Sequence, residues 1–95
     1  MRADSRRDIA CSVCIANYNG ADVLGACLDS VFQQDFALPI EVIVHDDAST
    51  DGSAAIVHEK YPAVRLIQSE THVGFCISNN RMAAEAGGEY ILLLN

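Results

Sequence analysis

The sequence predicts an α/β fold in which about four parallel strands form a sheet with helices on both faces. Three features predict it: short, nearly continuous apolar segments, longer segments with helical periodicity, and polar turns between the two. Strands that alternate with helices of this size form βαβ units, and strands covered on both faces are apolar at nearly every position. The chain has 95 residues, of which 51% are hydrophobic and 20% charged, so we expect one Rossmann-like domain.

A change in the spacing of apolar residues indicates the first strand and the first helix. Residues 9–16 (I-A-C-S-V-C-I-A) are almost all apolar and end at Asn17, which predicts a buried strand. Over residues 21–34 apolar side chains recur every three or four positions, which predicts an amphipathic helix with Asn19 or Gly20 at its start. Its apolar face would consist of Val23, Leu24, Cys27, Leu28, Val31 and Phe32.

Turn residues bound the remaining elements. The second helix stops before Pro62, because the residue that precedes a proline disfavours the helical conformation. Gly87 and Gly88 end the third helix, since glycine is the usual residue just beyond a helical carboxyl terminus. In chain order we expect a strand over 40–45, a polar loop over 46–53, a helix over 53–60, a strand over 64–68, a helix over 75–86 and a strand over 90–94.

The charge balance disfavours two classes of partner. The formal net charge is −7, which disfavours binding to nucleic acid and to anionic membrane surfaces. The basic residues Arg2, Arg6 and Arg7 belong to an amino terminus, residues 1–8, that we expect to be flexible and without a role. No apolar segment approaches the roughly 20 residues of a membrane span, so a cytoplasmic location is predicted.

Neither the cysteines nor the single strand-end histidine indicates a metal site. The chain has four cysteines, scattered through predicted strands and helices, which is typical of reduced, buried thiols. Cys11 and Cys14 lie three positions apart in a strand, so their side chains point to opposite faces and cannot share one zinc ion. We expect His45, beside two acids, to be hydrogen bonded rather than a ligand.

The functional site should lie where the strands end. Ligands of doubly wound sheets bind at the carboxyl ends of the strands, where we expect the loops at 17–20 and 46–53 and whatever follows Asn95 to converge. The first loop lacks the G-x-G-x-x-G turn of dinucleotide-binding dehydrogenases, which excludes that class. A phosphoacceptor receiver domain is also excluded, because the acid pair follows the second strand rather than the first.

Tyr18 and the acid pair are the two informative features of these loops. Tyr18 could stack on a nucleobase or ribose, or it could close the end of the core. The adjacent carboxylates of Asp46 and Asp47 repel each other unless a ligand, a cation or backbone N–H groups compensate them. One of them should face the cleft, where it could accept the ring N–H of uracil or thymine, or a ribose hydroxyl. Alternatively, Asp47 and Ser49 cap the helix that begins near Asp51.

Ordered motifs at compatible spacing cover most of the chain. They are S-V-C-I-A-N-Y-N-G, E-V-I-V-H-D-D-A-S-T-D-G-S, Y-P-A-V-R-L-I, H-V-G-F, N-N-R and G-G-E-Y-I-L-L-L-N. Together they resemble the amino-terminal half of family 2 nucleotide-sugar glycosyltransferases with the GT-A fold. The segments N-N-R and L-L-L-N most resemble the rhamnosyltransferase-type branch of that family.

This resemblance implies a set of nucleotide-binding residues. Ala16 and Tyr18 would contact base and ribose, Asp47 would bind the base, and Asn80 would lie near the nucleotide. Arg81 beside it is a plausible phosphate contact by charge alone. The family's metal-binding Asp-x-Asp motif would begin at or just after Asn95, with Mg²⁺ or Mn²⁺ bound in the intact enzyme and the catalytic base further along.

The implied function is transfer of a sugar from a UDP- or dTDP-sugar to an acceptor hydroxyl with inversion. Residues 9–95 would be the nucleotide-sugar-binding half, truncated at the metal motif and inactive alone. The acceptor would be a saccharide or a lipid-linked saccharide, which allows peripheral attachment at the inner membrane face. Departures from the family pattern are Ala16 in place of proline or threonine, His72 in place of asparagine, Met82 in place of glycine, and the segment 76–78 in place of a glycine-rich one.

A second hypothesis is a non-catalytic nucleotide-binding or self-associating α/β domain. The predicted fourth strand, residues 90–94, would be an exposed sheet edge with an apolar run, which favours pairing with another copy.

Overall fold

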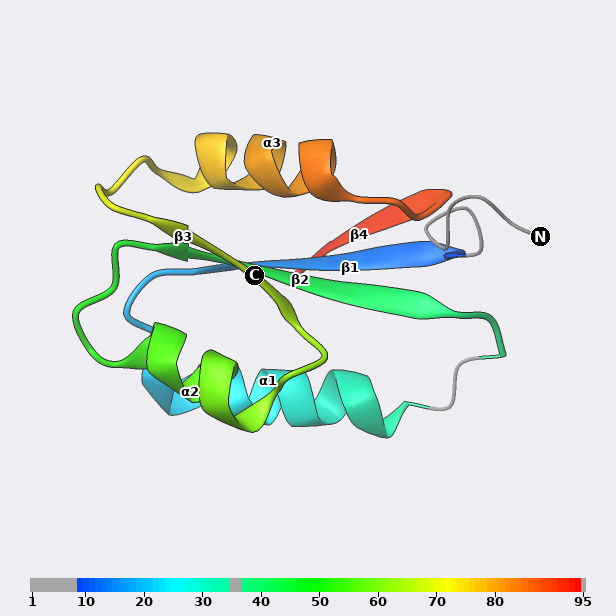
Figure 1. The fold of residues 1–95 in the computed structure, drawn as a ribbon, viewed down its shortest axis with the longest axis horizontal. Coiled ribbons are helices and arrows are strands. Elements are labelled where there is room, and N and C mark those ends of the chain that lie inside the picture. Colours follow the sequence, from blue (N-terminus) through cyan, green and yellow to red (C-terminus); the bar gives the residue numbers. More distant parts are fainter. Residues whose placement is uncertain (1–8, 35–36, 95) are drawn as a thin grey trace.

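The computed structural model describes residues 9–34 and 37–94 as an alternation of strands and helices (Figure 1). The expected flexible terminus at 1–8 and the expected metal-site neighbour Asn95 lie outside the described residues. The elements are β1 (Cys11–Asn17), α1 (Ala21–Gln33), β2 (Ile40–Asp47), α2 (Ser53–Lys60), β3 (Arg65–Ser69), α3 (Phe75–Glu85) and β4 (Tyr90–Leu94).

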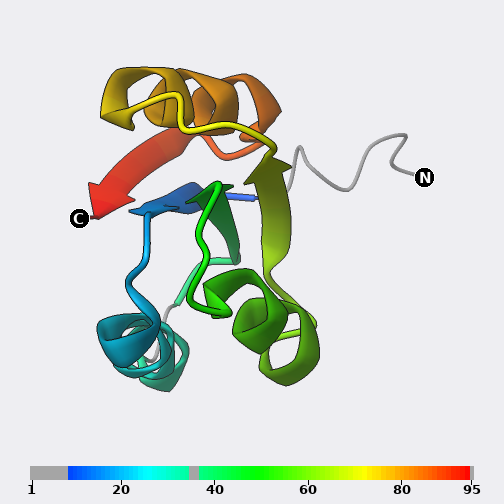
Figure 2. The same cartoon turned by 90° about the vertical axis from the view of Figure 1, so that its left-hand side faces the viewer.

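The four strands form one parallel sheet in the order β3-β2-β1-β4. Helices α1 and α2 cover one face of the sheet, and α3 covers the other (Figure 2). The predicted α/β fold is therefore confirmed. From β1 the strand order proceeds through β2 to β3 at one edge of the sheet, and α3 then leads back across the sheet to β4 at the other edge. The carboxyl ends of β1 and β2 therefore lie at the centre of the sheet.

The sheet separates two apolar clusters. The larger one lies under α1 and α2, and the smaller one lies under α3, where Met82 is fully buried against Cys14 and Ile43. Cys11 packs against the larger cluster and Cys14 belongs to the smaller, so the two thiols do point to opposite faces, as predicted. Burial is the first cause that raises the pKa of the Cys14 thiol, and the Glu41 charge adds to it, which keeps this sulfur a packed thiol.

The first helix is less amphipathic than its sequence indicates. Leu24, Leu28 and Val31 are buried, but Val23 is 67% exposed and Phe32 is 44% exposed. Leu24, Leu28 and Val31 lie on the face of α1 that packs on the sheet, and Val23 lies beside this face and points toward solvent. Phe32 stacks on Tyr61 from the end of α2, with ring centroids 6.3 Å apart.

Two glycines close the turn between α3 and β4. The N–H of Gly87 donates to Glu41 Oε2 at 2.6 Å, and the N–H of Gly88 donates to Ser12 Oγ at 2.8 Å. The Ser12 hydroxyl in turn donates to Glu41 Oε2 at 2.5 Å. A Cβ on Gly88 would lie 2.6 Å from the backbone nitrogen of Ser12, so this close approach requires glycine. The network fixes where β4 joins the sheet.

No helix in the described part of the chain is long and apolar enough to cross a bilayer.

Candidate functional site

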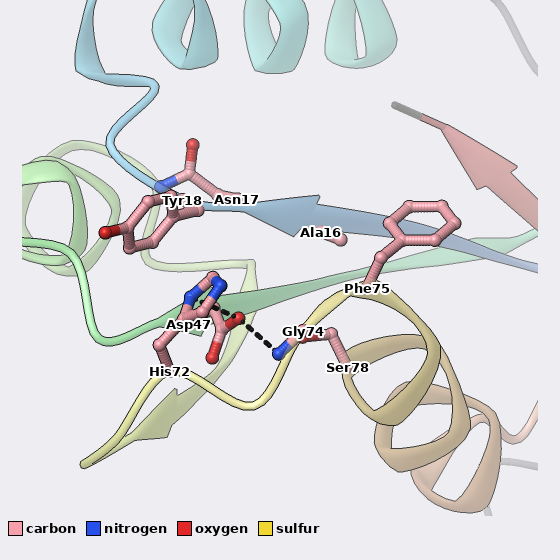
Figure 3. Close-up of a pocket in the computed structure, with 8 residues that line it drawn as sticks. All are labelled: Ala16, Asn17, Tyr18, Asp47, His72, Gly74, Phe75 and Ser78. Carbon is pink, nitrogen blue, oxygen red and sulfur yellow. Dashed lines mark hydrogen bonds and ion pairs between the residues drawn. The ribbon is translucent and has the colours of Figure 1, made fainter.

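A pocket of about 260 Å³ opens at the carboxyl ends of β1 and β2, beside the start of α3. Figure 3 shows Tyr18, His72 and Asp47 at the strand ends, with Gly74, Phe75 and Ser78 at the start of the helix. The lining residues are Ala16, Asn17, Tyr18, Asp47, His72, Gly74, Phe75 and Ser78. The place agrees with the rule that ligands of such sheets bind beyond the strand ends.

Asp47 is the only carboxylate among these lining residues, and it is nearly buried, at 4% exposure. Its Oδ1 accepts the backbone N–H of Val73 at 2.8 Å, and its Oδ2 accepts that of Gly74 at 2.9 Å. His72 Nδ1 lies 3.0 Å from the same Oδ2. Burial alone would raise the pKa of Asp47, but the two backbone donors and His72 outweigh it and lower this pKa. The site therefore holds a charged acceptor at neutral pH.

The alternative in which Asp47 and Ser49 cap the next helix is wrong. Helix α2 begins after Gly52, which takes a left-handed conformation (φ 85°), and the N–H of its first residue, Ser53, donates to Asp51 Oδ1 at 3.0 Å rather than to Asp47 or Ser49. The strand β2 instead continues through the acid pair, because Asp47 pairs with Ser69 of β3, so the polar loop begins later than predicted.

Asp46 has separate partners, which explains how two adjacent carboxylates coexist. Its Oδ1 accepts Asn17 Nδ2 at 2.9 Å, and its Oδ2 accepts the N–H of Ser49 at 3.1 Å. The N–H of Asn19 then donates to Ser49 Oγ at 2.8 Å. Donors from the last residue of β1 and from the loop after β2 compensate the charge of Asp46. Asp46 therefore joins these two segments, while Asp47 lines the pocket.

Tyr18 and His72 form one wall of the pocket. The Tyr18 ring is 54% exposed, so the alternative in which it closes the end of the core is wrong. Its centroid lies 4.4 Å from that of the His72 ring, with the planes tilted by 51°. An exposed ring beside a charged acceptor is suited to stack on a flat ligand.

The start of α3 is the part of the site that the sequence interpretation missed. Gly74, with φ 92°, Phe75 and Ser78 all line the pocket, and the buried hydroxyl of Ser78 has no hydrogen-bond partner. The signal was present, because the rule of carboxyl strand ends applies equally to the loop after the third strand. In the sequence His72 belongs to the segment H-V-G-F and is a departure from the family pattern, but neither observation gives it a place in the site.

Of the expected nucleotide-binding residues, Ala16, Tyr18 and Asp47 meet in the pocket, and Asn80 and Arg81 are not among its lining residues. Asn80 is exposed on α3.

The guanidinium of Arg81 has two neighbours outside the pocket. Its Nη1 donates to Ser69 Oγ at 3.1 Å and lies 3.4 Å from Nε2 of His45, whose Nδ1 has no partner. Burial first, and then the Arg81 charge, lower the pKa of His45, so this ring stays neutral.

Residues 9–34 and 37–94 contain no set of ligands for the Mg²⁺ or Mn²⁺ ion expected in the intact enzyme. No group of three or more His, Cys, Asp or Glu side chains in these ranges could hold a metal ion. The residue expected to adjoin the metal motif, Asn95, lies outside the described residues. The described groups alone can thus bind a flat ligand with an N–H donor, through one charged acceptor and one exposed ring.

Proteins of known structure share this fold. The structure of S. aureus TarS 1–349 in complex with UDP-GlcNAc superposes with a TM-score of 0.83 at 34% identity, over 90% of this chain and 26% of that one. The mannosyltransferase PcManGT from Pyrobaculum calidifontis, in complex with GDP-Man and Mn²⁺, gives a TM-score of 0.71 at 31% identity, over 80% and 24%. An N-acetylglucosaminyl-diphospho-decaprenol L-rhamnosyltransferase of Mycobacterium tuberculosis is 35% identical over 49 residues, which are 52% of this chain and 16% of that protein.

The sequence also matches a family model. The chain spans about 25% of the length of the first curated relatives that it matches. The model of glycosyl transferase family 2 matches residues 12–95, and the chain belongs to that family.

Proposed function

We propose that residues 9–95 form the donor-binding half of a glycosyltransferase and bind the nucleotide of a UDP- or dTDP-sugar in the pocket beside Asp47. The observation that carries the proposal is the position of the Asp47 carboxylate, held by two backbone N–H groups and turned toward an exposed tyrosine. Solved relatives that carry UDP-GlcNAc and GDP-Man support this class of ligand.

The base is recognised by a hydrogen bond and a ring contact. The Asp47 carboxylate accepts the N3–H of uracil or thymine, a ring donor that neutral cytosine lacks. The ring of Tyr18 packs against the base, and the backbone near Ala16 contacts base or ribose. Asn80 and Arg81 would act toward the diphosphate. The Arg81 guanidinium must then leave Ser69 and His45, which hold it in the free protein.

The rest of the reaction depends on groups outside the described residues. In the intact protein, transfer to an acceptor hydroxyl with inversion requires a base that deprotonates this hydroxyl, and a divalent cation would neutralise the leaving diphosphate. Neither a ligand set for the cation nor an assigned base is found in residues 9–34 and 37–94. We therefore propose that the 95 residues alone do not turn over any nucleotide-sugar. We also place the intact protein in the cytoplasm, peripheral to the inner membrane face, acting on a saccharide or lipid-linked acceptor.

The test is a calorimetric titration of UDP, dTDP, GDP and CDP against the wild-type chain and Asp47→Ala. UDP and dTDP should bind the wild type, and CDP should bind about tenfold more weakly because its N3 is an acceptor and cannot donate to Asp47. Asp47→Ala should remove the difference between UDP and CDP. Equal UDP affinity in the two proteins would overturn the assignment of Asp47 to the base.

A second candidate function, self-association, is favoured by the exposure of β4. Ile91, Leu92 and Leu93 are 46%, 48% and 49% exposed, and β4 pairs only with β1 in the described part of the chain. An apolar strand with a free edge is suited to pair with a second copy. Light scattering should show dimers or larger species at high concentration, and Leu92→Lys should shift them to monomer. A strictly monomeric wild type would rule this candidate out.

A further inference from the structure

The side chain of His72 makes the two contacts that the proposed base would make. Its Nδ1 lies 3.0 Å from Asp47 Oδ2, and its ring centroid lies 4.4 Å from that of Tyr18. An imidazole is a planar heterocycle with an N–H donor at its edge, as uracil and thymine are. Figure 3 shows the His72 ring at the end of β2, beside Tyr18 and Asp47.

The two rings leave no space between them for a base. A ring sandwiched between Tyr18 and His72 would need their centroids roughly 7 Å apart, twice the usual contact distance between carbon atoms. The observed separation is 4.4 Å. A base that packs on this side of Tyr18 and donates to Asp47 must therefore take the place of the imidazole.

Asp47 also has few acceptor positions left. A carboxylate offers about four, and the N–H groups of Val73 and Gly74 occupy one on each oxygen. His72 lies against a further position on Oδ2. Its side chain is 56% exposed and nothing else in the described residues bonds to it, so the ring can swing out into solvent.

We infer that His72 occupies the base position of the free protein and that a nucleotide binds by displacing it. This inference rests on the proposed function. It defines the ligand as a nucleotide whose base is a flat ring with an N–H directed at Asp47, as in uracil and thymine. The affinity of such a ligand is reduced by the fraction of molecules in which the imidazole fills the site.

The test is a titration of UDP against the wild type and His72→Ala, with His58→Ala as the matched control. His58 is an exposed histidine on α2, on the opposite face of the sheet from α3 (Figure 2). UDP should bind His72→Ala about fivefold more tightly than the wild type. The exposed pair of His72 with Asp47 and the contact of its ring with Tyr18 no longer compete with the nucleotide in this variant. His58→Ala should bind UDP as the wild type does.

A second measurement follows the ring itself. In proton NMR spectra of the wild type, addition of UDP should move the His72 ring signals toward those of solvent-exposed His58, since contact with Tyr18 is lost. Far-UV circular dichroism checks that both variants remain folded.

Each contrary result has a distinct meaning. Weaker or equal binding of UDP to His72→Ala, or His72 signals that do not move when UDP binds, would overturn the inference and leave the proposed nucleotide site intact. Failure of UDP to bind both the wild type and His72→Ala would overturn the proposed site, and the inference with it.

Discussion

Replacing Asp47 by alanine removes the acceptor that fixes the loop between β3 and α3. In the wild type the N–H groups of Val73 and Gly74 donate to this carboxylate at 2.8 and 2.9 Å. Both residues are partly buried, and neither N–H has another partner in the described residues. In Asp47→Ala both N–H groups lose this acceptor and can bond only to water that reaches them.

The expected loss follows from these two bonds. A hydrogen bond to a charged group contributes about 1.5–3 kcal/mol, and partial exposure favours the lower end of that range. Two such bonds predict that Asp47→Ala lowers the free energy of unfolding by about 3 kcal/mol. Domains of this size unfold with about 5–15 kcal/mol, so the loss is a large share of the total.

The loss should depend on pH in a defined direction. The pKa of Asp47 in the folded protein lies below its ordinary value of 3.8, because the charged form is stabilised by its donors. Its contribution is therefore complete above that ordinary value and disappears as the pH falls through the folded pKa. The difference in the free energy of unfolding between the wild type and Asp47→Ala should therefore become smaller in acid.

The assay is urea unfolding followed by far-UV circular dichroism, at pH 7 and in steps below pH 4. Glu70→Ala is the control, since Glu70 is an exposed carboxylate in the same loop. A loss of under about 0.5 kcal/mol at pH 7 would refute the anchoring role of Asp47. A loss that stays constant down to low pH would refute its ionised state.

Three other substitutions test how α3 and the turn after it pack on the sheet. Gly88→Ala should cost about 3 kcal/mol, because the new Cβ would lie 2.6 Å from the backbone nitrogen of Ser12, and thermal unfolding measures the cost. Met82→Ala should cost about 2–5 kcal/mol by urea unfolding, since Met82 is fully buried under α3; a cost near zero would contradict the tight packing of this helix. Arg65→Ala should cost less than about 1 kcal/mol in the same assay, because its 2.5 Å ion pair with Glu85 is half exposed.

The sequence was sufficient to predict the order of elements and their parallel arrangement. Hydrophobic periodicity is a local property, and the segments at 53–60 and 90–94 match α2 and β4 to the residue. It was not sufficient for the end of β2. Asp46 and Asp47 are polar and resemble a loop, but they continue the strand because β3 pairs with them. Pairing between distant segments overrides local composition here.

The candidate site was predicted only in part, because some of its contacts also join segments that are distant in the sequence. Tyr18 and Asp47 follow predicted strands, so the rule of strand ends identifies both. The partners of Asp47, however, are backbone groups 26 and 27 positions further along, which no local pattern indicates. Ser78 enters the pocket because α3 packs over β1 and β2, and His72 enters it because Asp47 holds the loop before α3.

Substitution of Asp47 changes both the loop and the proposed base contact, whereas a change of ligand changes only the contact. UDP and CDP carry the same ribose and diphosphate and differ only on one edge of the base, where cytosine replaces the N3–H of uracil by an acceptor nitrogen and its O4 by an amino group. Their comparison therefore tests the proposed base contact with Asp47 while the loop stays unaltered.

The most direct test of the central claim is the ratio of dissociation constants for UDP and CDP with the wild-type chain at neutral pH. We predict that UDP binds about tenfold more tightly. Equal affinity for the two nucleotides, or a preference for CDP, would contradict the assignment of Asp47 as the acceptor of the base.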